Sequence, residues 1–505
     1  MGYRTIPQLL LDAAGRDPDG AWLHSDDAEL TFGEAAAAVG GRAATLAQHG
    51  IARGDLVLLT ARTTPAYLLA WLAITSMGAI AVSTNPASTR AEFAGLIGQT
   101  HPRAVVTDVQ LRPLIEHPFV LDIDELAGSG SEEVPDRVVK PDDLAALIPT
   151  SGTTGRSKLV MQTHRAYAMA GEGFPFWMEL SARDRLMTSL PLFHINAPAY
   201  SVLGSLACGA GLVLLPRFSA SGFLDTARRH GATEFNAIGA MLEILMRQPE
   251  RPDDADHPLR LCYTGPAPER ERQLEIERRF GLRIVCGYAM SETPYGLIWP
   301  RGSRLYGTLG TVRQHPTMGV VNEARVVDDG GGDVRPGATG ELLLRNPAVT
   351  PGYWQMPAET AAALTADGWL HTGDLVTGDG NGVYTFVARA KEVLRRRGEN
   401  LSPLEVEDAI QAHPSVVECA VVGVASELSE EEIKAFVVTS GPADFDALRE
   451  WTAQRLTAFK VPRYWQQLDA LPRTPTQRVA KHLLPTGHPK DERDMTGDIN
   501  KHPTR

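Results

Sequence analysis

The chain has 505 residues, of which 43% are hydrophobic and 22% are charged, a composition typical of a folded globular protein. This length exceeds the roughly 250–300 residues at which a single hydrophobic core stops growing, so we expect at least two domains. The 49 Lys and Arg residues against 61 Asp and Glu residues give a net charge of −12, which disfavours nucleic acid or an anionic membrane surface as a general partner.

The first sixty residues predict a helix at 6–14, a hairpin at 21–31, a second helix at 32–49 and a strand at 55–59. The most apolar segment follows at residues 66–82, and polar residues and a glycine interrupt it. Such a segment is marginal in length for a membrane span. It therefore predicts a buried helix followed by a strand.

Apolar runs then alternate with helical segments, which predicts an α/β fold of layered sheets and helices. A turn-rich run at 328–337 indicates a smaller β-rich lobe over about residues 308–387. After Arg389 the pattern changes to short helices and strands, typical of a small α+β domain. We therefore predict domains at residues 1–390 and 391–486, and a tail at 487–505 that is too polar to pack. The expected strands of the large domain are 79–83, 104–107, 211–215, 233–238, 260–264 and 283–287, and the expected elements of the small domain are 403–412, 416–424, 433–439 and 444–455.

The cysteines and the N-terminus bear on the cellular setting. The four cysteines include no CxxC pair and no neighbouring histidine at metal-ligand spacing, so neither a disulfide framework nor a zinc site is expected. The first residues lack the apolar core of a signal peptide. Together these features predict a cytoplasmic protein in a reducing compartment.

Residues 149–158, PTSGTTGRSK, follow a buried apolar run at 144–148. Small residues let backbone amides approach phosphate oxygens, hydroxyls add donors, and Lys158 supplies a point charge. A surface loop without a ligand can have the same composition, and the run lacks the Gly-Lys-Ser/Thr ending of a Walker loop. Taken alone, the run indicates a site for a phosphorylated small molecule.

Three further segments accompany this loop: YAMSET at 288–293, a strand that begins at Glu341, and WLHTGD at 369–374, which precedes Arg389. Together they resemble the adenylate-forming superfamily of acyl-CoA synthetases, peptide-synthetase adenylation domains and firefly luciferase, over most of the chain. Among stand-alone members the resemblance is to acyl-CoA ligases of the fatty-acid and crotonobetaine/carnitine kind. It implies a large N-terminal domain of layered mixed sheets with a β-rich lobe, and a small, mobile α+β C-terminal domain.

The resemblance implies an ATP site. Tyr288 is at the position that stacks on adenine, and Ser291 is at a phosphate-contacting position. Glu292 is at the position that helps hold Mg²⁺, and a carboxylate oxygen is a hard ligand that suits this ion. Asp374 and Arg389 are at the positions that hold the ribose hydroxyls. The other positions are Ser151, Gly152, Thr153, Thr154, Gly155 and Lys158 in the phosphate loop, and Gly265, Pro266 and Ala267 along the adenine base.

The resemblance also implies a reaction in two steps. A carboxylate attacks the α-phosphate of ATP to give an acyl-adenylate and pyrophosphate, and the thiol of CoA then displaces AMP. The small domain rotates between the steps, with Lys391 at the hinge and Gly398 lining the pantetheine tunnel. His194 is at a position that resembles that of the family's aromatic gate residue between the substrate pockets. The alternative is a histidine buried in the core. The arginines at 395–397 either contact the phosphates of CoA or form a solvated charged face.

One motif departs from the family. The usual Pro-X₄-Gly-Lys motif near the C-terminus has Gln477 and Arg478 at its last two positions, and a planar guanidinium does not substitute freely for a compact ammonium. In one hypothesis Lys481, three residues on, replaces the lysine and the protein catalyses both steps. In a second, the protein only converts an acyl-adenylate from a separate adenylating enzyme into a CoA thioester. A nucleotide-binding pseudoenzyme is a further alternative.

The positions expected to line the acyl pocket are mostly small and apolar, and none is basic. We therefore predict a roomy pocket for a bulky or aliphatic carboxylic acid. These positions are Ile195, Asn196, Gly239, Ala240 and residues 294–296.

Overall fold

The N-terminal part of the chain contains a six-stranded sheet. In spatial order its strands are β6 (Val120–Asp122), β5 (Ala104–Thr107), β3 (Leu56–Thr60), β4 (Ile80–Ser83), β7 (Leu144–Thr150) and β8 (Lys158–Thr163). All pairs are parallel except β7 with β8. The residues of β3, β4 and β5 are buried, as expected for parallel strands covered on both faces. The structure is a computed structural model and describes residues 2–127, 134, 139–150, 157–265, 268–390, 394–396, 399–425, 431–456, 460–473, 479–485, 487 and 492–495.

A nine-stranded sheet forms the second layer. Its order is β15 (Thr311–Val312), β14 (Thr293–Ile298), β13 (Arg283–Met290), β12 (Leu261–Gly265), β11 (Glu234–Ile238), β9 (Arg185–Thr188), β10 (Gly211–Leu214), β1 (Ala21–His24) and β2 (Glu29–Thr31). The central strands are parallel, and antiparallel pairs occur at the two edges. The α/β fold predicted from the sequence is confirmed, and the predicted strands lie within a few residues of the observed ones.

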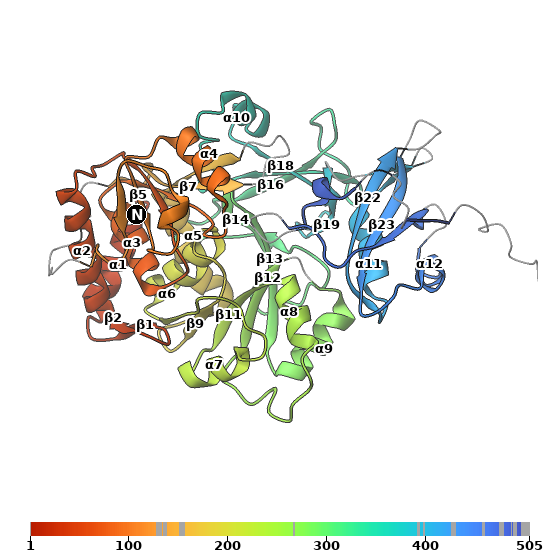
Figure 1. The fold of residues 1–505 in the computed structure, drawn as a ribbon, viewed down its shortest axis with the longest axis horizontal. Helices are drawn as coiled ribbons and strands as arrows, with labels where there is room; N and C mark the ends of the chain where they lie inside the picture. The colour runs from red at the N-terminus through yellow and green to blue at the C-terminus, as the bar shows by residue number, and fades with distance from the viewer. Residues whose placement is uncertain are drawn as a thin grey trace, which may run out of the picture.

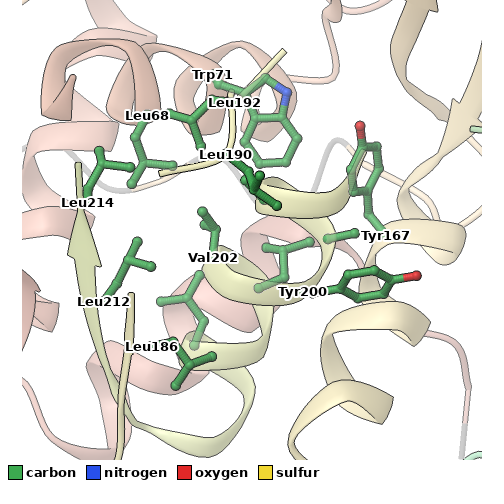
Figure 2. Packing of buried hydrophobic residues seen from close by; sticks show 14 of the residues in the cluster. Leu68, Trp71, Tyr167, Leu186, Leu190, Leu192, Tyr200, Val202, Leu212 and Leu214 are labelled. Atoms are coloured by element: carbon green, nitrogen blue, oxygen red, sulfur yellow. The ribbon is translucent and has the colours of Figure 1, made fainter. Parts of the chain in front are cut away.

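Helices pack between and around the two sheets (Figure 1). The apolar segment predicted as a helix and a strand is α3 (Pro65–Ser76) followed by β4, and α3 is buried along most of its length. Figure 2 shows Val202 of the π-helix η2 (Ala197–Val202) packed among side chains of α3 and β10, whereas Tyr200 of the same helix lies beside Tyr167. No helix within the described ranges is both long and apolar enough to cross a bilayer. The other helices of this part are α1 (Ile6–Arg16), α2 (Phe32–Gln48), α4 (Arg90–Thr100), η1 (Arg112–Leu114), α5 (His164–Met178), α6 (Leu203–Cys208), α7 (Phe223–His230), α8 (Gly239–Met246), α9 (Arg270–Phe280) and α10 (Pro357–Ala363).

The predicted β-rich lobe is a four-stranded antiparallel sheet of β16 (Glu323–Val327), β17 (Thr339–Arg345), β18 (Leu370–Gly378) and β19 (Tyr384–Arg389). It begins later than expected, because residues 311–312 pair with β14 of the nine-stranded sheet instead. Its apolar face packs on Leu297 of β14. The lobe therefore lies directly beside the carboxyl end of β13.

The C-terminal part forms a separate unit, drawn in blue in Figure 1. Val406, Ile410, Val437 and Trp465 are fully buried in its own hydrophobic core. The unit has the α+β character predicted from the sequence, while the proposed boundary at residue 391 stays a prediction. Its elements are β20 (Leu394–Arg396), β21 (Glu399–Leu401), α11 (Pro403–Gln411), β22 (Val416–Ala425), β23 (Glu431–Thr439), α12 (Phe445–Ala453), β24 (Tyr464–Gln467), η5 (Lys481–Leu483) and β25 (Arg493–Asp494).

The prediction that the tail does not pack is wrong for its described residues. Strand β25 pairs antiparallel with β24 and extends the C-terminal sheet. The reason is Lys434 of β23, whose side chain is fully buried. Its ammonium pairs with the carboxylate of Glu492 and donates to the carbonyl of Gly487 at 2.8 Å. A buried cation requires such partners, so charge helps to hold the polar tail, together with Met495, which packs against the hydrophobic core of this unit.

The packing of α5 predicts a pH dependence of stability. The ring of His164 is fully buried, and its Nδ1 accepts a hydrogen bond from the backbone N–H of Ile6 at 3.4 Å. Burial lowers the pKa of His164 to about 3, so the folded protein holds the neutral ring while the unfolded chain takes up a proton below about 6.5. The free energy of unfolding should therefore fall by about 2 kcal/mol between pH 7.5 and pH 5 through this group.

Denaturant unfolding of the wild type and His164→Asn at several pH values tests this expectation. The asparagine keeps an acceptor for Ile6 and does not titrate, so its stability should depend less on pH over this range. Parallel pH profiles for the two proteins would contradict the prediction.

Candidate active site

Three residues that the sequence assigned to nucleotide binding meet at the edge of the β-rich lobe. Asp374 of β18 and Arg389 of β19 are opposite each other in the antiparallel ladder, and the Arg389 Nε atom is 2.8 Å from Asp374 Oδ1. The hydroxyl of Tyr288, on β13, donates to Asp374 Oδ2 at 2.5 Å. Burial and the adjacent Asp374 charge raise the pKa of Tyr288, so the phenol stays protonated and remains a donor. The two sheets thus place an aromatic ring, a buried carboxylate and a guanidinium together.

Glu341 fixes the irregular part of β18 that carries Asp374. Its Oε1 accepts from the backbone N–H of Gly373 at 2.9 Å, and its Oε2 is 2.8 Å from His371 Nδ1. Gly373 has a φ of 69°, a conformation that glycine adopts without a steric penalty. Thr372 adds a hydrogen bond from its hydroxyl to the carbonyl of Leu342 at 2.7 Å. The sequence marked Glu341 only as the start of a strand, and the structure gives it this positioning role.

Ser291 and Glu292 form the turn between β13 and β14, where Met290 pairs with Thr293. The side chain of Gln162, on β8, donates to the Ser291 carbonyl, and the Thr350 N–H donates to the Glu292 carbonyl at 2.7 Å. Both contacts come from segments far from the turn in sequence. The turn is therefore held in place by the six-stranded sheet as well as by its own strands.

Lys158 and Glu292 both contact the side chain of Tyr353. Lys158 is the first residue of β8, and its Nζ is 4.6 Å from the centre of the Tyr353 ring. The Tyr353 hydroxyl donates to Glu292 Oε1 at 2.9 Å. Lys158 also pairs with Thr150 of β7, so these two residues flank the predicted phosphate loop. The loop residues Ser151, Gly152, Thr153, Thr154 and Gly155 lie outside the described residues.

The donor set at Glu292 fits Mg²⁺ bound together with a nucleotide. Nowhere in the described ranges do three or more His, Cys, Asp or Glu side chains cluster as metal ligands. Mg²⁺ is usually held by one or two carboxylates together with substrate phosphates and water, rather than by a protein cage. One hydrogen bond to Oε1 is compatible with coordination through the second oxygen of Glu292. This carboxylate would thus hold the ion, and the ion would neutralise phosphate charge.

Gly265 is the last residue of β12, and it lies beside Gly287, the residue before Tyr288. A Cβ atom at Gly265 would lie 2.6 Å from the carbonyl oxygen of Gly287, closer than real side chains approach. The backbone of β12 can therefore lie against β13 only if this position lacks a side chain. Of the other predicted base-lining positions, Pro266 and Ala267 lie outside the described residues.

This close approach predicts that Gly265→Ala destabilises the protein by about 1–3 kcal/mol, because the added methyl must displace a backbone carbonyl. Gly95→Ala is the matched control, since a Cβ there meets nothing within 4 Å. Thermal unfolding and ATP titration of both variants check the expectation. Equal unfolding temperatures for the two variants would show that β12 and β13 can separate without cost.

His194 lies just before η2, with its ring centre 4.4 Å from that of Phe193. The next residue, Ile195, packs against the apolar cluster that contains Tyr353 and Val160. The structure thus brings the predicted gate to the same side of the molecule as Lys158 and Tyr353. Its function as a gate stays a prediction.

The sequence did not identify Arg313 as a neighbour of the expected acyl pocket. Its guanidinium is fully buried and donates to the carbonyl of Pro294 at 3.2 Å and to the hydroxyl of Tyr200 at 2.8 Å. It also donates to the hydroxyl of Tyr263. These partners are neutral, so they do not cancel the positive charge of Arg313. This charge therefore lies next to Pro294, one of the positions expected to line the acyl pocket.

The C-terminal site residues are only partly described. Lys481 is the first residue of η5, and its Nζ is 2.8 Å from Glu407 Oε1 on α11. The same Glu407 oxygen accepts from the backbone N–H of Val421 at 2.6 Å. Lys481 is therefore paired within the small domain in this arrangement. Lys391, Gly398 and Arg478 lie outside the described residues.

Two family models match this chain, one in each of its two parts. Residues 10–354 match the AMP-binding enzyme family, and residues 405–478 match the AMP-binding enzyme C-terminal domain. The crotonobetaine/carnitine–CoA ligase of Salmonella heidelberg (strain SL476) is 31% identical over 470 residues, which cover 86% of this chain and 89% of that protein.

Two solved structures show the same fold over nearly the full length. ATP-bound MatB from Rhodopseudomonas palustris has a TM-score of 0.85 and 27% identity, and the match covers 95% of this chain and 98% of that one. The o-succinylbenzoate CoA synthetase of Bacillus subtilis, solved with its acyl-adenylate intermediate, has a TM-score of 0.85 and 26% identity, with 97% and 99% covered.

These matches span both parts of the chain in the order that the sequence motifs predicted. They confirm the resemblance to the adenylate-forming superfamily and the predicted enzyme class, an AMP-forming acyl-CoA synthetase. The chain belongs to the AMP-binding enzyme family.

Proposed function

We propose that this protein joins a carboxylic acid to CoA through an acyl-adenylate, with ATP and Mg²⁺ as co-substrate and metal. The observation that carries the proposal is the network of Tyr288, Asp374 and Arg389, which offers an aromatic face and a charged pair for an adenosine. Lys158 and Glu292 form a second group around Tyr353. In this group the cation would meet the phosphates and the carboxylate would hold Mg²⁺. In such a reaction the protein acts mainly by positioning and by neutralising charge.

A second candidate is catalysis of the thioester step alone, on an acyl-adenylate supplied by another enzyme. The observation that favours it is the ion pair of Lys481 with Glu407. To replace the lysine missing from position 478, Lys481 would have to leave a carboxylate that is itself fixed by the N–H of Val421. This pairing disfavours Lys481 as the adenylating lysine in the domain arrangement described.

Two half-reaction assays separate the candidates. Acid-dependent exchange of pyrophosphate into ATP reports adenylation, and loss of CoA thiol with a synthetic acyl-adenylate reports thioester formation. A full ligase gives both signals, and an enzyme of the second step gives only the latter. If neither signal appears with a broad panel of acids although ATP binds, the protein is a nucleotide-binding pseudoenzyme and both proposals fall.

We further propose that the acid has an uncharged acyl chain, as the small apolar pocket positions suggest. The buried guanidinium of Arg313 contacts the Pro294 carbonyl, so a cationic acyl group nearby would meet like charge without solvent screening. In a competition between a betaine acid and its uncharged carbon isostere, the isostere should be the better substrate. Preference for the betaine would contradict this assignment.

A further inference from the structure

We infer that Tyr353 is a positioning residue that couples the metal-binding carboxylate of Glu292 to the phosphate-binding cation of Lys158. No motif in the sequence pointed to Tyr353. The inference rests on the proposed function, because it takes Glu292 and Lys158 as the groups that meet Mg²⁺ and phosphate.

The contacts of the Tyr353 side chain carry the inference. Its hydroxyl donates to Glu292 Oε1 at 2.9 Å, and its ring face lies 4.6 Å from the Nζ of Lys158. Tyr353 is 7% exposed, so both contacts are made largely away from solvent. One side chain thus orients the carboxylate and supports the cation.

The backbone around Tyr353 is held by β8, which begins at Lys158, and by the turn that carries Glu292. It forms an antiparallel bridge with Val160 of β8, and the N–H of the next residue, Trp354, donates to the carbonyl of Leu159 at 2.9 Å. Three residues earlier, the hydroxyl of Thr350 donates to Met161 on β8, and its N–H donates to the carbonyl of Glu292. The segment 350–354 is therefore fixed between the strand that starts at Lys158 and the turn that holds Glu292.

Groups that hydrogen-bond a metal ligand fix its orientation, and their loss typically lowers metal affinity or activity 10- to 100-fold. The phenol of Tyr353 has this relation to Glu292. Without it, the carboxylate is free to rotate and must be ordered each time Mg²⁺ binds. The ring makes a separate contribution, because an aromatic face attracts an ammonium group.

The test is ATP binding by calorimetry, with excess Mg²⁺ and with EDTA. Tyr353→Phe removes only the hydroxyl, so it should lose about tenfold in ATP affinity with Mg²⁺ and keep wild-type affinity in EDTA. Tyr353→Leu also removes the ring and should lose affinity in both conditions, since Lys158 loses its support. Tyr384→Phe, a half-buried tyrosine of β19, is the control and should match the wild type throughout.

Two results with Tyr353→Phe would overturn the inference. In one, Tyr353→Phe keeps wild-type affinity in both conditions; in the other, it loses the same factor with and without Mg²⁺, as a merely structural residue would. A wild type whose ATP affinity does not depend on Mg²⁺ also overturns it. If the wild type binds no ATP in either condition, the proposed function fails as well, which distinguishes the two failures.

Discussion

Arg478→Lys is expected to raise the rate of acyl-adenylate formation, by up to about a thousandfold. The compact ammonium of lysine can lie between a carboxylate and a phosphate, where a planar guanidinium fits poorly. One such contact at about 4 Å in an effective dielectric of about 20 contributes on the order of 4 kcal/mol, which sets the size of the effect. Pyrophosphate exchange with a fixed acid measures the gain, and thioester formation from a preformed acyl-adenylate should change little.

Lys481→Ala and Glu407→Gln are the controls for this experiment, because each breaks the ion pair between α11 and η5. If Lys481 is the adenylating group, only Lys481→Ala abolishes exchange. If the ion pair has only a structural role, both variants lower the exchange rate to the same extent. An Arg478→Lys variant with no more exchange than the wild type would show that position 478 does not limit adenylation.

Asp374→Asn is expected to lower kcat/KM for ATP by about a hundredfold. An amide cannot form the ion pair with Arg389, and it must still satisfy the hydroxyl of Tyr288 in a fully buried position. Loss of a charge-assisted contact of this kind costs about 3 kcal/mol, which corresponds to the predicted factor. Steady-state kinetics at varied ATP, together with AMP titration, measures the change.

The effect should be specific to the nucleotide. Asp379→Asn changes a carboxylate that caps the nearby turn through the N–H groups of Asn381 and Val383, and it should leave ATP use unchanged. Affinity for CoA should be similar in both variants. If Asp374→Asn weakens CoA and ATP to the same degree, the residue supports the fold of the lobe rather than the nucleotide.

The sequence predicted those helices and strands whose own residues carry a regular apolar pattern. The helix at Phe32–Gln48 has an apolar face and a capping box of Thr31 and Glu34, so its start was visible without tertiary information. Tyr288 was assigned to adenine and the pair of Asp374 and Arg389 to the ribose hydroxyls, in each case through motifs. Their hydrogen bond and ion pair could not be read from the sequence, because they depend on how the lobe sheet packs on β14.

The missed features lack a local signal. Tyr353 and Glu292 are 61 positions apart, and their contact depends on the packing of residues 350–354 against both β8 and the turn that carries Glu292. Arg313 follows a two-residue strand and looks like any surface arginine until its burial is known. Strand β25 has two polar residues, and the contacts that hold it, the pairing of the buried Lys434 with Glu492 and the ion pair of Arg463 with Asp494, leave no local pattern in the sequence.

The pairing of Lys434 with Glu492 has a consequence for protein engineering. The match to the family's C-terminal domain ends at residue 478, while the carboxylate that neutralises Lys434 comes from residue 492. A chimaera that exchanges the small domain at the family boundary would leave an ammonium buried without a counter-charge, at a cost of about 3–5 kcal/mol. Domain exchange between this protein and its relatives should therefore carry the tail along with the domain.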